Sequence, residues 1–468
     1  MTRFDLIIIG AGPGGADLAQ LATEHDLTVA LIEKDVLGGT CLNRGCIPTK
    51  ALLHLAEFQH NLHHLNEEGL FSDGALDPVE IMQEKALAYR DKIVHGQRNG
   101  LEGSIKRNKK ITLYHDHGQI LGGGEVLLMN SGERLHAEYI VLATGSSPHI
   151  PPIPGAGSKL IKTSDDFLDE RIHHDVWDFS SIVIVGGGVI GVELADYFQS
   201  QGKHVTIIEA LDRILANMDI QISRSLQQDF KKRGITCITS ARVDSITETQ
   251  EGLEISYQDS KSSEHRNLRA DQVLLATGRR ANTEGLLADG LALNMDRGAV
   301  LVDTNYQTSL PNVYAIGDVR SGSKLLAHEA SLDAKRVLQI ILGKNLEPAP
   351  VVPLCVYTTP EISQVGITEE MARAQGISTL TGKASTLANA RTQIAGGRRG
   401  YINLVFAEED LQLIGGQWFG ERATDFVDEL ALAINQKLTL HDLAKQCHAH
   451  PSYGESLGMA VQQALAKI

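Results

Sequence analysis

The sequence predicts an α/β fold with two related units, followed by a third, α+β domain. Two repetitions predict the related units. An apolar strand runs into a glycine-rich turn at residues 4–15 and again at 181–191, and the tripeptide Ala-Thr-Gly follows an apolar strand at 143–145 and again at 276–278. Repetition at such long spacing indicates a repeated structural unit. From about residue 350 the pattern changes to strands with less regular helices, which predicts the third domain.

The length and composition are those of a globular protein with several domains. A chain of 468 residues is too long for one ordinary core and suggests two to four domains. No apolar run reaches the roughly 18 residues that cross a bilayer, so we expect no membrane partner. The formal charge of −15 argues against nucleic acid and leaves a basic protein partner open. No targeting pattern precedes the first strand, so we expect a cytoplasmic location.

The first glycine-rich turn has the spacing of a dinucleotide fingerprint. Gly10, Gly12 and Gly15 follow an apolar strand and precede a helical stretch. This fingerprint needs glycine for the tight turn, for the approach of a pyrophosphate and for close packing of the helix on the strand. The next strand ends in Glu33, which is placed to accept hydrogen bonds from an adenosine ribose. The segment therefore predicts a Rossmann-like dinucleotide-binding domain.

The second glycine-rich turn repeats the fingerprint. Gly186, Gly188 and Gly191 follow the strand at 181–185, and the next strand ends in Glu209. An acid at this place favours the free 2′-hydroxyl of NAD and repels the 2′-phosphate of NADP. We therefore predict a second Rossmann-like domain that prefers NAD.

Cys41 and Cys46 are the candidate redox-active residues. On an ideal helix, residues five positions apart lie about 140° apart around the axis, too far to bond without distortion. Pro48 offers a cause of distortion because it removes a backbone donor, and Lys50 brings a positive charge. A strained disulfide is easily reduced, as suits catalysis. The spacing alone also allows two ordinary buried cysteines. The remaining cysteines are isolated, which suggests small buried apolar residues: Cys237, Cys355 and Cys447.

His450 and Glu455 are candidates for an acid–base pair. The chain places the carboxylate five residues after the histidine, and Pro451 favours a turn or a helix start between them. The two side chains can then form a hydrogen bond. Without further context, the alternative is a surface histidine near a helix start.

Four histidines lie along a helix predicted at 51–64, and their spacing raises the question of a metal. Histidines three or four positions apart can share a metal ion, as His60, His63 and His64 could. No second cluster of ligands accompanies them, and a solvated helix face explains them together with His54. We expect no metal site.

The stretch at residues 38–50, together with the other motifs in their order, closely resembles the flavoprotein disulfide reductases of the class I pyridine nucleotide-disulfide oxidoreductase family. The resemblance covers nearly the whole chain. It implies FAD in the first unit, NAD in the second and a homodimer joined through the C-terminal domain. The residues of the stretch are most similar to those of family members that oxidise dihydrolipoamide to lipoamide with NAD, so the resemblance implies this activity.

The resemblance also implies roles for individual residues. Cys41 would exchange with the substrate, Cys46 would lie next to the flavin, and His450, from the other subunit, would act as the base that Glu455 orients. Glu193 would pair with Lys50 beside the flavin and nicotinamide, and Asp318 would bind the ribityl chain of FAD. The further implied cofactor contacts are Gly118, Thr144, Gly145, Val243, Gly278, Ala327 and His328.

The domain boundaries expected from these motifs are 1–150 for the FAD-binding domain, 151–279 for the NAD-binding domain, 280–347 for a return to the FAD domain and 348–468 for the dimerisation domain. Two departures from the family pattern stand out. Asp333-Ala334 replaces a common Glu-Gly, and Tyr453 is bulkier than usual. The second departure puts access of the substrate in question.

Rival functions stay open at this stage. A reductase of another low-molecular-weight disulfide is the nearest, although Glu209 argues against the NADPH that such enzymes generally use. A mercuric reductase would carry an extra cysteine pair near its C-terminus. A structural subunit of low activity would not need Cys41, Cys46, His450 and Glu455. The expected partner is a lipoyl group, carried on a 2-oxo acid dehydrogenase or glycine cleavage component.

Overall fold

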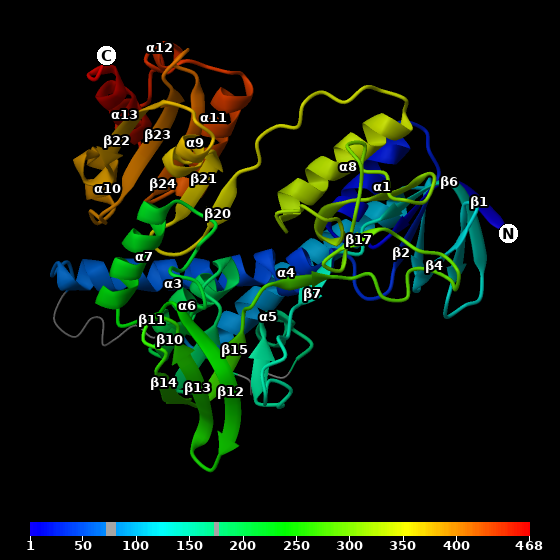
Figure 1. Ribbon diagram of the computed structural model, residues 1–468, viewed down its shortest axis with the longest axis horizontal. Helices are drawn as coiled ribbons and strands as arrows, with labels where there is room; N and C mark the ends of the chain where they lie inside the picture. The colour runs from blue at the N-terminus through cyan, green and yellow to red at the C-terminus, as the bar shows by residue number, and fades with distance from the viewer. Residues whose placement is uncertain (72–80, 173–176) are drawn as a thin grey trace.

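The computed structural model describes residues 1–71, 81–172 and 177–468. The predicted α/β fold is confirmed. Two units lie side by side, the first with a mixed sheet that is mainly parallel and the second with a parallel sheet, and a third domain with an antiparallel sheet packs against the second unit (Figure 1). A stretch without regular structure, residues 343–353, crosses from the first unit to the third domain. The expected domain boundaries stay a prediction.

The sheet of the first unit has the order β3-β2-β1-β6-β5-β4, with β19 beside β6. Strand β1 is parallel to β2 and β6, with Ile7 opposite Ala30 and Ile140. All three side chains are buried, as a sheet covered on both faces requires. The strands are β1 (Thr2–Ile9), β2 (Val29–Glu33), β3 (Ile111–His115), β4 (Gly118–Gly122), β5 (Glu125–Leu128), β6 (Arg134–Leu142) and β19 (Val313–Ala315).

Helices α1 (Pro13–Glu24) and α8 (Ala327–Ile341) pack together on this sheet, and α2, α3 and α4 lead towards the second unit (Figure 1). The helix predicted at 51–64 belongs to α3. The helical periodicity of residues 81–101 likewise predicts a helix, which belongs to α4. The short basic run at residues 106–110 predicts an exposed turn, but its first two residues continue α4. The three helices are α2 (Gly39–Arg44), α3 (Cys46–Glu67) and α4 (Gln83–Arg107).

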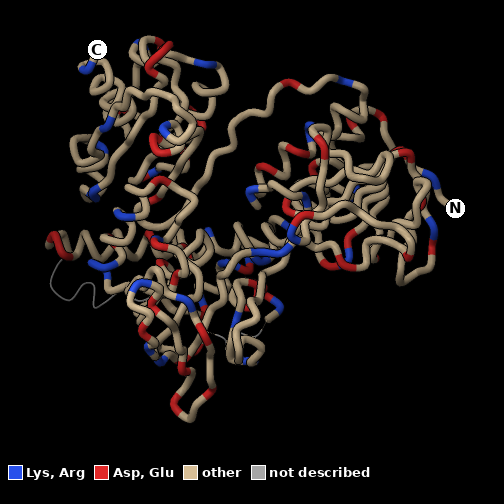
Figure 2. The backbone as a smooth tube through the Cα atoms, viewed as in Figure 1, with Lys and Arg blue, Asp and Glu red and all other residues tan. Residues whose placement is uncertain are grey.

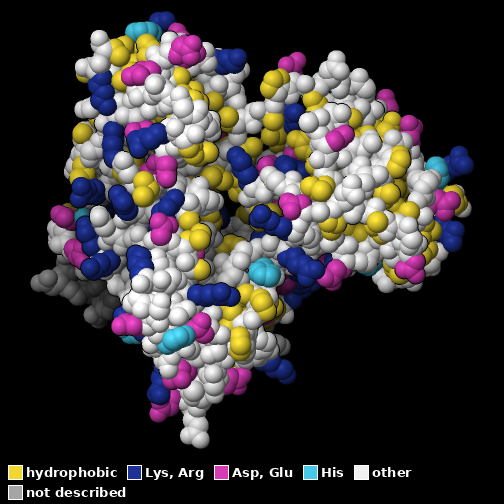
Figure 3. All heavy atoms as spheres, viewed as in Figure 1, with side chains coloured by type: hydrophobic (Ala, Val, Ile, Leu, Met, Phe, Trp, Pro, Cys, Tyr) yellow, Lys and Arg dark blue, Asp and Glu magenta, His cyan; other side chains and the backbone are white. Residues whose placement is uncertain are grey.

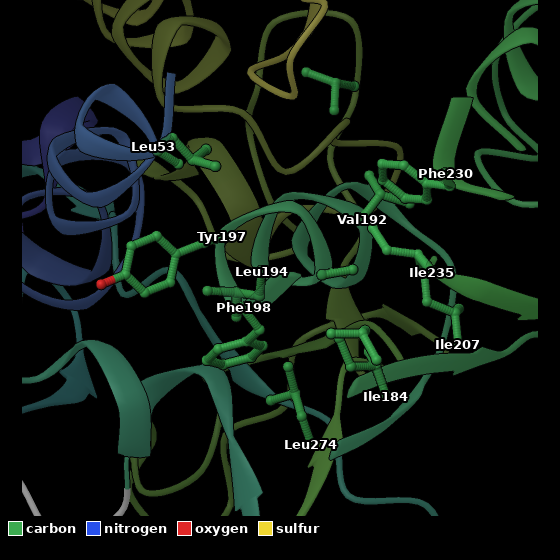
Figure 4. Packing of buried hydrophobic residues seen from close by; sticks show 14 of the residues in the cluster. Leu53, Ile184, Val192, Leu194, Tyr197, Phe198, Ile207, Phe230, Ile235 and Leu274 are labelled. Atoms are coloured by element: carbon green, nitrogen blue, oxygen red, sulfur yellow. The ribbon is translucent and has the colours of Figure 1, made fainter. Parts of the chain in front are cut away.

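The second unit has a parallel sheet of order β11-β10-β9-β15-β8 and a separate antiparallel sheet of β12, β13 and β14. Its core is formed around helix α6, where Phe198 packs with side chains from the sheet and Tyr197 lies on the side of Leu53 (Figure 4). The elements are β8 (Ile161–Thr163), α5 (Ser164–Leu168), β9 (Ser181–Val185), α6 (Val189–Ser200), β10 (His204–Ile208), α7 (Ile220–Lys232), β11 (Thr236–Ile238), β12 (Ala241–Thr249), β13 (Gly252–Asp259), β14 (His265–Ala270) and β15 (Gln272–Leu275).

Where the chain returns from the second unit to the first, β16 (Arg279–Ala281) pairs with β7 (Ser146–Pro148) in a two-stranded antiparallel ribbon. Each strand follows one of the two Ala-Thr-Gly tripeptides. The repeated tripeptides therefore meet at the junction between the units. The remaining short elements are β17 (Met295–Asp296), β18 (Ala299–Val300), η2 (Gly317–Val319) and η3 (Thr386–Ala388).

The third domain is a five-stranded antiparallel sheet of order β20-β21-β24-β23-β22, with α11 against β21 and β24 and α13 against β22 and β23. The residues from Val356 onwards predict a strand that begins there, but β20 ends at Val356 and a loop follows. The elements are β20 (Leu354–Val356), β21 (Ile362–Gly366), α9 (Glu369–Ala374), β22 (Thr379–Ser385), α10 (Ala390–Ile394), β23 (Tyr401–Ala407), β24 (Leu413–Phe419), α11 (Ala423–Asn435), α12 (Leu440–Leu443) and α13 (Glu455–Leu465).

Charged residues of both signs are interspersed along all parts of the chain (Figure 2). On the face shown in Figure 3, the surface is hollowed between the first unit and the rest of the molecule. Among the described helices, none combines the length and the apolar character that a bilayer crossing requires.

Candidate active site

The redox stretch is built on a break between two helices. Helix α2 ends at Arg44, Gly45 adopts φ −139° and ψ −113°, and α3 begins at Cys46. A Cβ atom on Gly45 would lie 2.9 Å from the carbonyl oxygen of Thr40, so the break needs a residue without a side chain. Pro48 lies in the first turn of α3, where proline is tolerated. The distortion is therefore at Gly45, and the prediction that placed it at Pro48 was wrong.

Cys41 and Cys46 are free thiols in this structure and do not form the disulfide that was expected. The hydrogen bond between the two side chains lowers the pKa of Cys46 to about 7, opposed by burial and assisted by the charge of Lys50. The same hydrogen bond and burial raise the pKa of Cys41. The pair therefore holds a proton on Cys41 and favours a thiolate at Cys46, as in the reduced form of a redox pair.

Lys50 and Glu193 come from different units and form a close ion pair. The Nζ atom of Lys50 lies 2.9 and 2.7 Å from the two carboxylate oxygens of Glu193, which is 3% exposed. The backbone N–H of Tyr357 also donates to this carboxylate, at 2.9 Å, and Lys50 lies 4.7 Å from the centre of the Tyr357 ring. Burial alone would lower the pKa of Lys50, but Glu193 and the Cys46 thiolate outweigh it and raise the pKa.

The loop after β20 is fastened to the second unit by two charged side chains, of which Asp196 is fully buried. Asp196, on α6, accepts a hydrogen bond from the backbone N–H of Thr359 at 2.7 Å. Arg233, which follows α7, donates to the carbonyl oxygen of Thr359 at 2.7 Å and forms an ion pair with Asp196. We call this arrangement of Asp196, Arg233 and Thr359 the clamp. It fixes the loop and with it Tyr357, whose backbone N–H donates to Glu193.

The first glycine turn leaves room for a pyrophosphate. Gly10 has φ +107°, and a Cβ atom on it would lie 2.3 Å from the carbonyl oxygen of Ala143. A Cβ on Gly15 would lie 1.9 Å from the carbonyl oxygen of Gly10, which shows how closely α1 meets the turn. Beside Gly12, the nearest atom to such a Cβ is 4.0 Å away. The turn therefore fits a dinucleotide, with the open space at Gly12.

The carboxylate of Glu33 braces this turn. One oxygen accepts from the N–H of Ala11 at 2.8 Å and the other from the N–H of Asp35 at 2.9 Å. Glu33 is 8% exposed. Each oxygen keeps further lone pairs that a ribose hydroxyl could use.

The second glycine turn has the same geometry. Gly186 has φ +110° and approaches the carbonyl oxygen of Ala276 as closely as Gly10 approaches Ala143, while the space around Gly188 is open. Glu209 accepts from the N–H of Gly187 at 2.6 Å and from that of Leu211 at 2.7 Å. This turn therefore also fits a dinucleotide.

Arg213 lies four residues after Glu209, a cation that the sequence reasoning did not weigh. Its guanidinium donates to the carbonyl oxygen of Ala216 at 3.1 Å and to the carboxylate of Asp212 at 3.2 Å. Glu209 is thus the acid at the end of β10, and Arg213 is engaged by its own loop. The preference for a free ribose hydroxyl stays a prediction.

Asp318 lies at the carboxyl end of β19, against the first Ala-Thr-Gly. The hydroxyl of Ser146 donates to one of its carboxylate oxygens at 2.6 Å. Burial raises the pKa of Asp318, opposed by this hydrogen bond. Sequence reasoning missed Ser146, although it follows directly on Gly145. One oxygen of Asp318 therefore remains for a ligand.

The departure at Asp333-Ala334 has a structural explanation. The carboxylate of Asp333, 1% exposed, accepts from the N–H of Gly317 at 3.0 Å and from Nε of Arg320 at 2.6 Å. Gly317 directly precedes Asp318. The aspartate therefore fixes the turn that carries the predicted ribityl ligand.

The remaining predicted cofactor positions divide into three groups. Gly118 and Val243 are enclosed by the cores of their units, so only their backbone could meet a ligand. Gly145 and Gly278 have positive φ and open space beside them. Three others hold hydrogen bonds or helix starts: Thr144 donates to the carbonyl oxygen of Asn282, Ala327 begins α8, and His328 donates from Nε2 to the carbonyl oxygen of Pro353.

His450 and Glu455 form the hydrogen-bonded pair that the turn allows. Nδ1 of His450 lies 2.9 Å from Oε1 of Glu455, and the N–H of Ser452 donates to Oε2 at 2.9 Å. The Ser452 hydrogen bond, and then His450, lower the pKa of Glu455. His450 is 74% exposed. Within the described part of one chain, no hydrogen bond or ion pair joins it to Cys41 or Cys46.

Tyr453 packs against the core of the third domain, and the guanidinium of Arg391 lies 5.8 Å from its ring centre. The bulk of the tyrosine is therefore accommodated by the third domain itself.

The predicted solvated histidine face of α3 is only partly exposed, because Nε2 of His60 lies 3.8 Å from Asp196. Among the described residues, no group of three or more His, Cys, Asp or Glu side chains is arranged to hold a metal ion.

A cavity of about 200 Å³ opens beside Lys50, between α3 and the third domain. Burial raises the pKa of two carboxyls in its wall, those of Glu361 and Glu421. The other lining residues include His54, Glu57, Tyr357, Thr359, Arg398 and Asp425. The cavity therefore reaches Lys50 from the side of the third domain.

The geometry defines a class of protein. Two dinucleotide turns flank a cysteine pair whose second thiol is poised as a thiolate beside a half-buried lysine, as in an oxidoreductase that moves electrons between a dithiol and dinucleotides. The chain belongs to the pyridine nucleotide-disulphide oxidoreductase family, whose model matches residues 4–334. The dimerisation domain of the same family matches residues 352–461. The predicted family is confirmed.

Curated relatives match over nearly the whole chain. The dihydrolipoyl dehydrogenase of Bacillus subtilis (strain 168) is 34% identical over 480 residues, which cover 100% of this chain and 99% of the relative. The dihydrolipoyl dehydrogenase of Halobacterium salinarum is 35% identical over 475 residues, which cover 99% of this chain and 97% of the relative.

Solved structures agree on the fold. The Cu(II) complex of the HOCl-induced flavoprotein disulfide reductase RclA from Escherichia coli has a TM-score of 0.84 at 27% identity, and the match covers 99% of both chains. LpdA from Mycobacterium tuberculosis has a TM-score of 0.85 at 23% identity, also over 99% of both chains, and supports the fold alone.

Proposed function

We propose that the protein is a flavoprotein that oxidises dihydrolipoamide to lipoamide with NAD, working as a homodimer. The observation that carries the proposal is the pair of thiols at Cys41 and Cys46, with opposite pKa shifts, beside Lys50 and Glu193. The names of the relatives supply the substrate. The dimerisation domain supports the homodimer.

The two glycine turns are the proposed cofactor sites, FAD at Gly10, Gly12, Gly15 and Glu33, and NAD at Gly186, Gly188, Gly191 and Glu209. When bound, FAD accepts an electron pair from the enzyme dithiol and passes it to NAD as a hydride. Asp318 would hold the ribityl chain of FAD. The additional proposed contacts are Gly118, Thr144, Gly145, Val243, Gly278, Ala327 and His328.

The thiol steps follow from the positions of the protons. In the oxidised enzyme, His450 of the partner subunit removes a proton from one thiol of dihydrolipoamide, and Glu455 of the partner subunit orients its imidazole. The resulting thiolate attacks the sulfur of Cys41, the Cys41–Cys46 bond breaks, and Cys46 leaves as a thiolate. The low pKa of Cys46 makes it the better leaving group.

The second half of the exchange releases the product. The remaining substrate thiol loses its proton and displaces the sulfur of Cys41 from the mixed disulfide, which closes the ring of lipoamide. Cys41 takes up a proton, in keeping with its raised pKa. The substrate has then lost two electrons and two protons, and the enzyme holds the dithiol seen in this structure.

The proposed source of the dithiol is a lipoyl group on a 2-oxo acid dehydrogenase or glycine cleavage component. The proposed compartment is the cytoplasm, where reducing conditions keep isolated thiols such as Cys237, Cys355 and Cys447 free. The likeness to a flavoprotein disulfide reductase favours one rival, the reduction of another low-molecular-weight disulfide.

A steady-state assay of the purified flavin-loaded dimer separates these functions. We expect turnover with dihydrolipoamide and NAD that exceeds turnover with glutathione disulfide and NADPH. The matched variants are Cys41→Ser and Cys46→Ser, which both remove turnover. Cys41→Ser should keep a long-wavelength thiolate-to-flavin absorption band, and Cys46→Ser should lose it. A higher specificity constant for glutathione disulfide would support the rival instead.

A further inference from the structure

Arg279 occupies the junction at which the chain returns from the second unit to the first. It follows the second Ala-Thr-Gly directly and begins β16, where it pairs with Pro148 of β7. Its side chain is 10% exposed. The proposed reaction assigns it no role.

The guanidinium makes hydrogen bonds to the first unit from two of its nitrogens. Nε donates to the hydroxyl of Ser146 at 2.8 Å, and Nη2 donates to the carbonyl oxygen of Ser146 at 2.6 Å. Nη2 also donates to the hydroxyl of Thr40 at 3.3 Å. Because the Ser146 hydroxyl donates in turn to Asp318, Arg279 fixes the direction in which that hydroxyl points.

These contacts differ from those of an ordinary structural arginine. The nearest carboxylate, that of Asp165, lies 4.0 Å from Nη1, so no close ion pair explains the burial. Its neighbour Arg280 is 61% exposed and forms a surface pair with Glu284 at 3.3 Å. Thr40 immediately precedes Cys41, so the guanidinium reaches both the redox turn and the proposed flavin ligand.

We propose that Arg279 is a positioning residue that holds the redox turn, through Thr40, and the flavin ligand Asp318, through Ser146, in one fixed arrangement. The proposal rests on the proposed function only in taking FAD as the ligand of the first unit. Without the guanidinium, the Ser146 hydroxyl can turn to another acceptor, and Asp318 loses its fixed orientation. Arg279 therefore contributes to the affinity for FAD without touching the reacting sulfurs.

The test measures the dissociation constant for FAD by fluorescence titration of the full-length apoprotein. We expect Arg279→Met and Ser146→Ala each to raise the constant about tenfold, since each removes a hydrogen bond to a charged group. The double variant should exceed the single ones by much less than a further tenfold, because both changes interrupt one chain of hydrogen bonds. Arg279→Lys should recover part of the affinity.

The matched control is Arg280→Met, which removes the neighbouring charge and should leave the affinity unchanged. Equal affinities of Arg279→Met and Arg280→Met would overturn the proposal, as would full additivity with Ser146→Ala. If Arg279→Met does not fold, Ser146→Ala decides, and an unchanged affinity there overturns the proposal. A wild-type protein that takes up no FAD would overturn the proposed function and this inference together.

Discussion

The two glycine turns share their backbone geometry and differ in what lies over them. A Cβ on Gly10 or on Gly186 would lie 2.3 Å from a carbonyl oxygen of the neighbouring strand end. Over the first turn, however, the redox stretch closes in: a Cβ on Gly39 would come within 2.8 Å of Gly12, whereas the space around Gly188 is open. One fingerprint thus makes a covered site and an open site, as a resident cofactor and an exchanging coenzyme require.

The largest expected effect comes from filling the two turns. Gly12→Val should abolish flavin binding and turnover, because the side chain enters the open space beside Gly12 that a pyrophosphate would need. Gly188→Val should keep the flavin and raise the KM for NAD by about tenfold or more, since binding alone is affected. Flavin absorbance after gel filtration and steady-state kinetics measure both. A Gly12→Val protein with a full complement of flavin would contradict the assignment of the covered site.

The second largest effect is expected from a substitution outside the two glycine turns. His450→Gln should slow dihydrolipoamide oxidation by about 100-fold or more, because it removes a general base. The flavin content should stay that of the wild type. His448→Gln is the control, since His448 lies two residues earlier and faces Glu429 at 3.3 Å. Similar turnover numbers for the two variants would remove His450 from the reaction.

The acid at the end of β10, Glu209, should determine the preference between NAD and NADP. Like charges in a partly buried site cost on the order of 1–3 kcal/mol, so Glu209→Gln should reduce the preference for NAD over NADP by roughly tenfold. Glu33→Gln, the same change in the covered turn, should leave this preference as it is. The readout is the ratio of specificity constants for NAD and NADP. An unchanged ratio in Glu209→Gln would show that another group selects the coenzyme.

The smallest effect is a shift along the pH axis. Since the thiolate is the reactive form, alkylation of the dithiol enzyme by iodoacetamide should rise with pH and reach half its maximum near pH 7, the pKa of Cys46. Lys50→Met removes a positive charge that stabilises the thiolate, so its profile should move to higher pH. Rates measured between pH 5 and 10 test this. A wild-type midpoint near that of an ordinary thiol would contradict the assignment of Cys46.

The glycine turns could be predicted from the sequence because their requirements are local. A positive φ at Gly10 and a tight approach at Gly15 depend on a few neighbouring residues. The break at Gly45 was missed because Pro48 offered a familiar reason for distortion, whereas the actual constraint is the carbonyl oxygen of Thr40. The sequence shows the glycine at this break, but it does not show the close contact that requires a glycine there.

Other parts of the site depend on contacts between distant segments. The pairing of Lys50 with Glu193 joins residues 143 positions apart, and only the family resemblance pointed to it. Ser146 and Arg279 form their chain of hydrogen bonds across the junction of the units, where neither spacing nor residue type predicts it. Periodicity predicts elements, and long-range polar contacts need the fold.

The clamp on the loop after β20 limits how far the second unit can swing. Separating it from the third domain would break three hydrogen bonds to charged groups, those of Asp196 and Arg233 with Thr359 and of Glu193 with Tyr357. At about 1.5–3 kcal/mol each, their loss would keep a hinged-open form below roughly one molecule in a thousand. We therefore expect the second unit and the third domain to move as one body, with NAD entering and leaving by small movements at the mouth of its site.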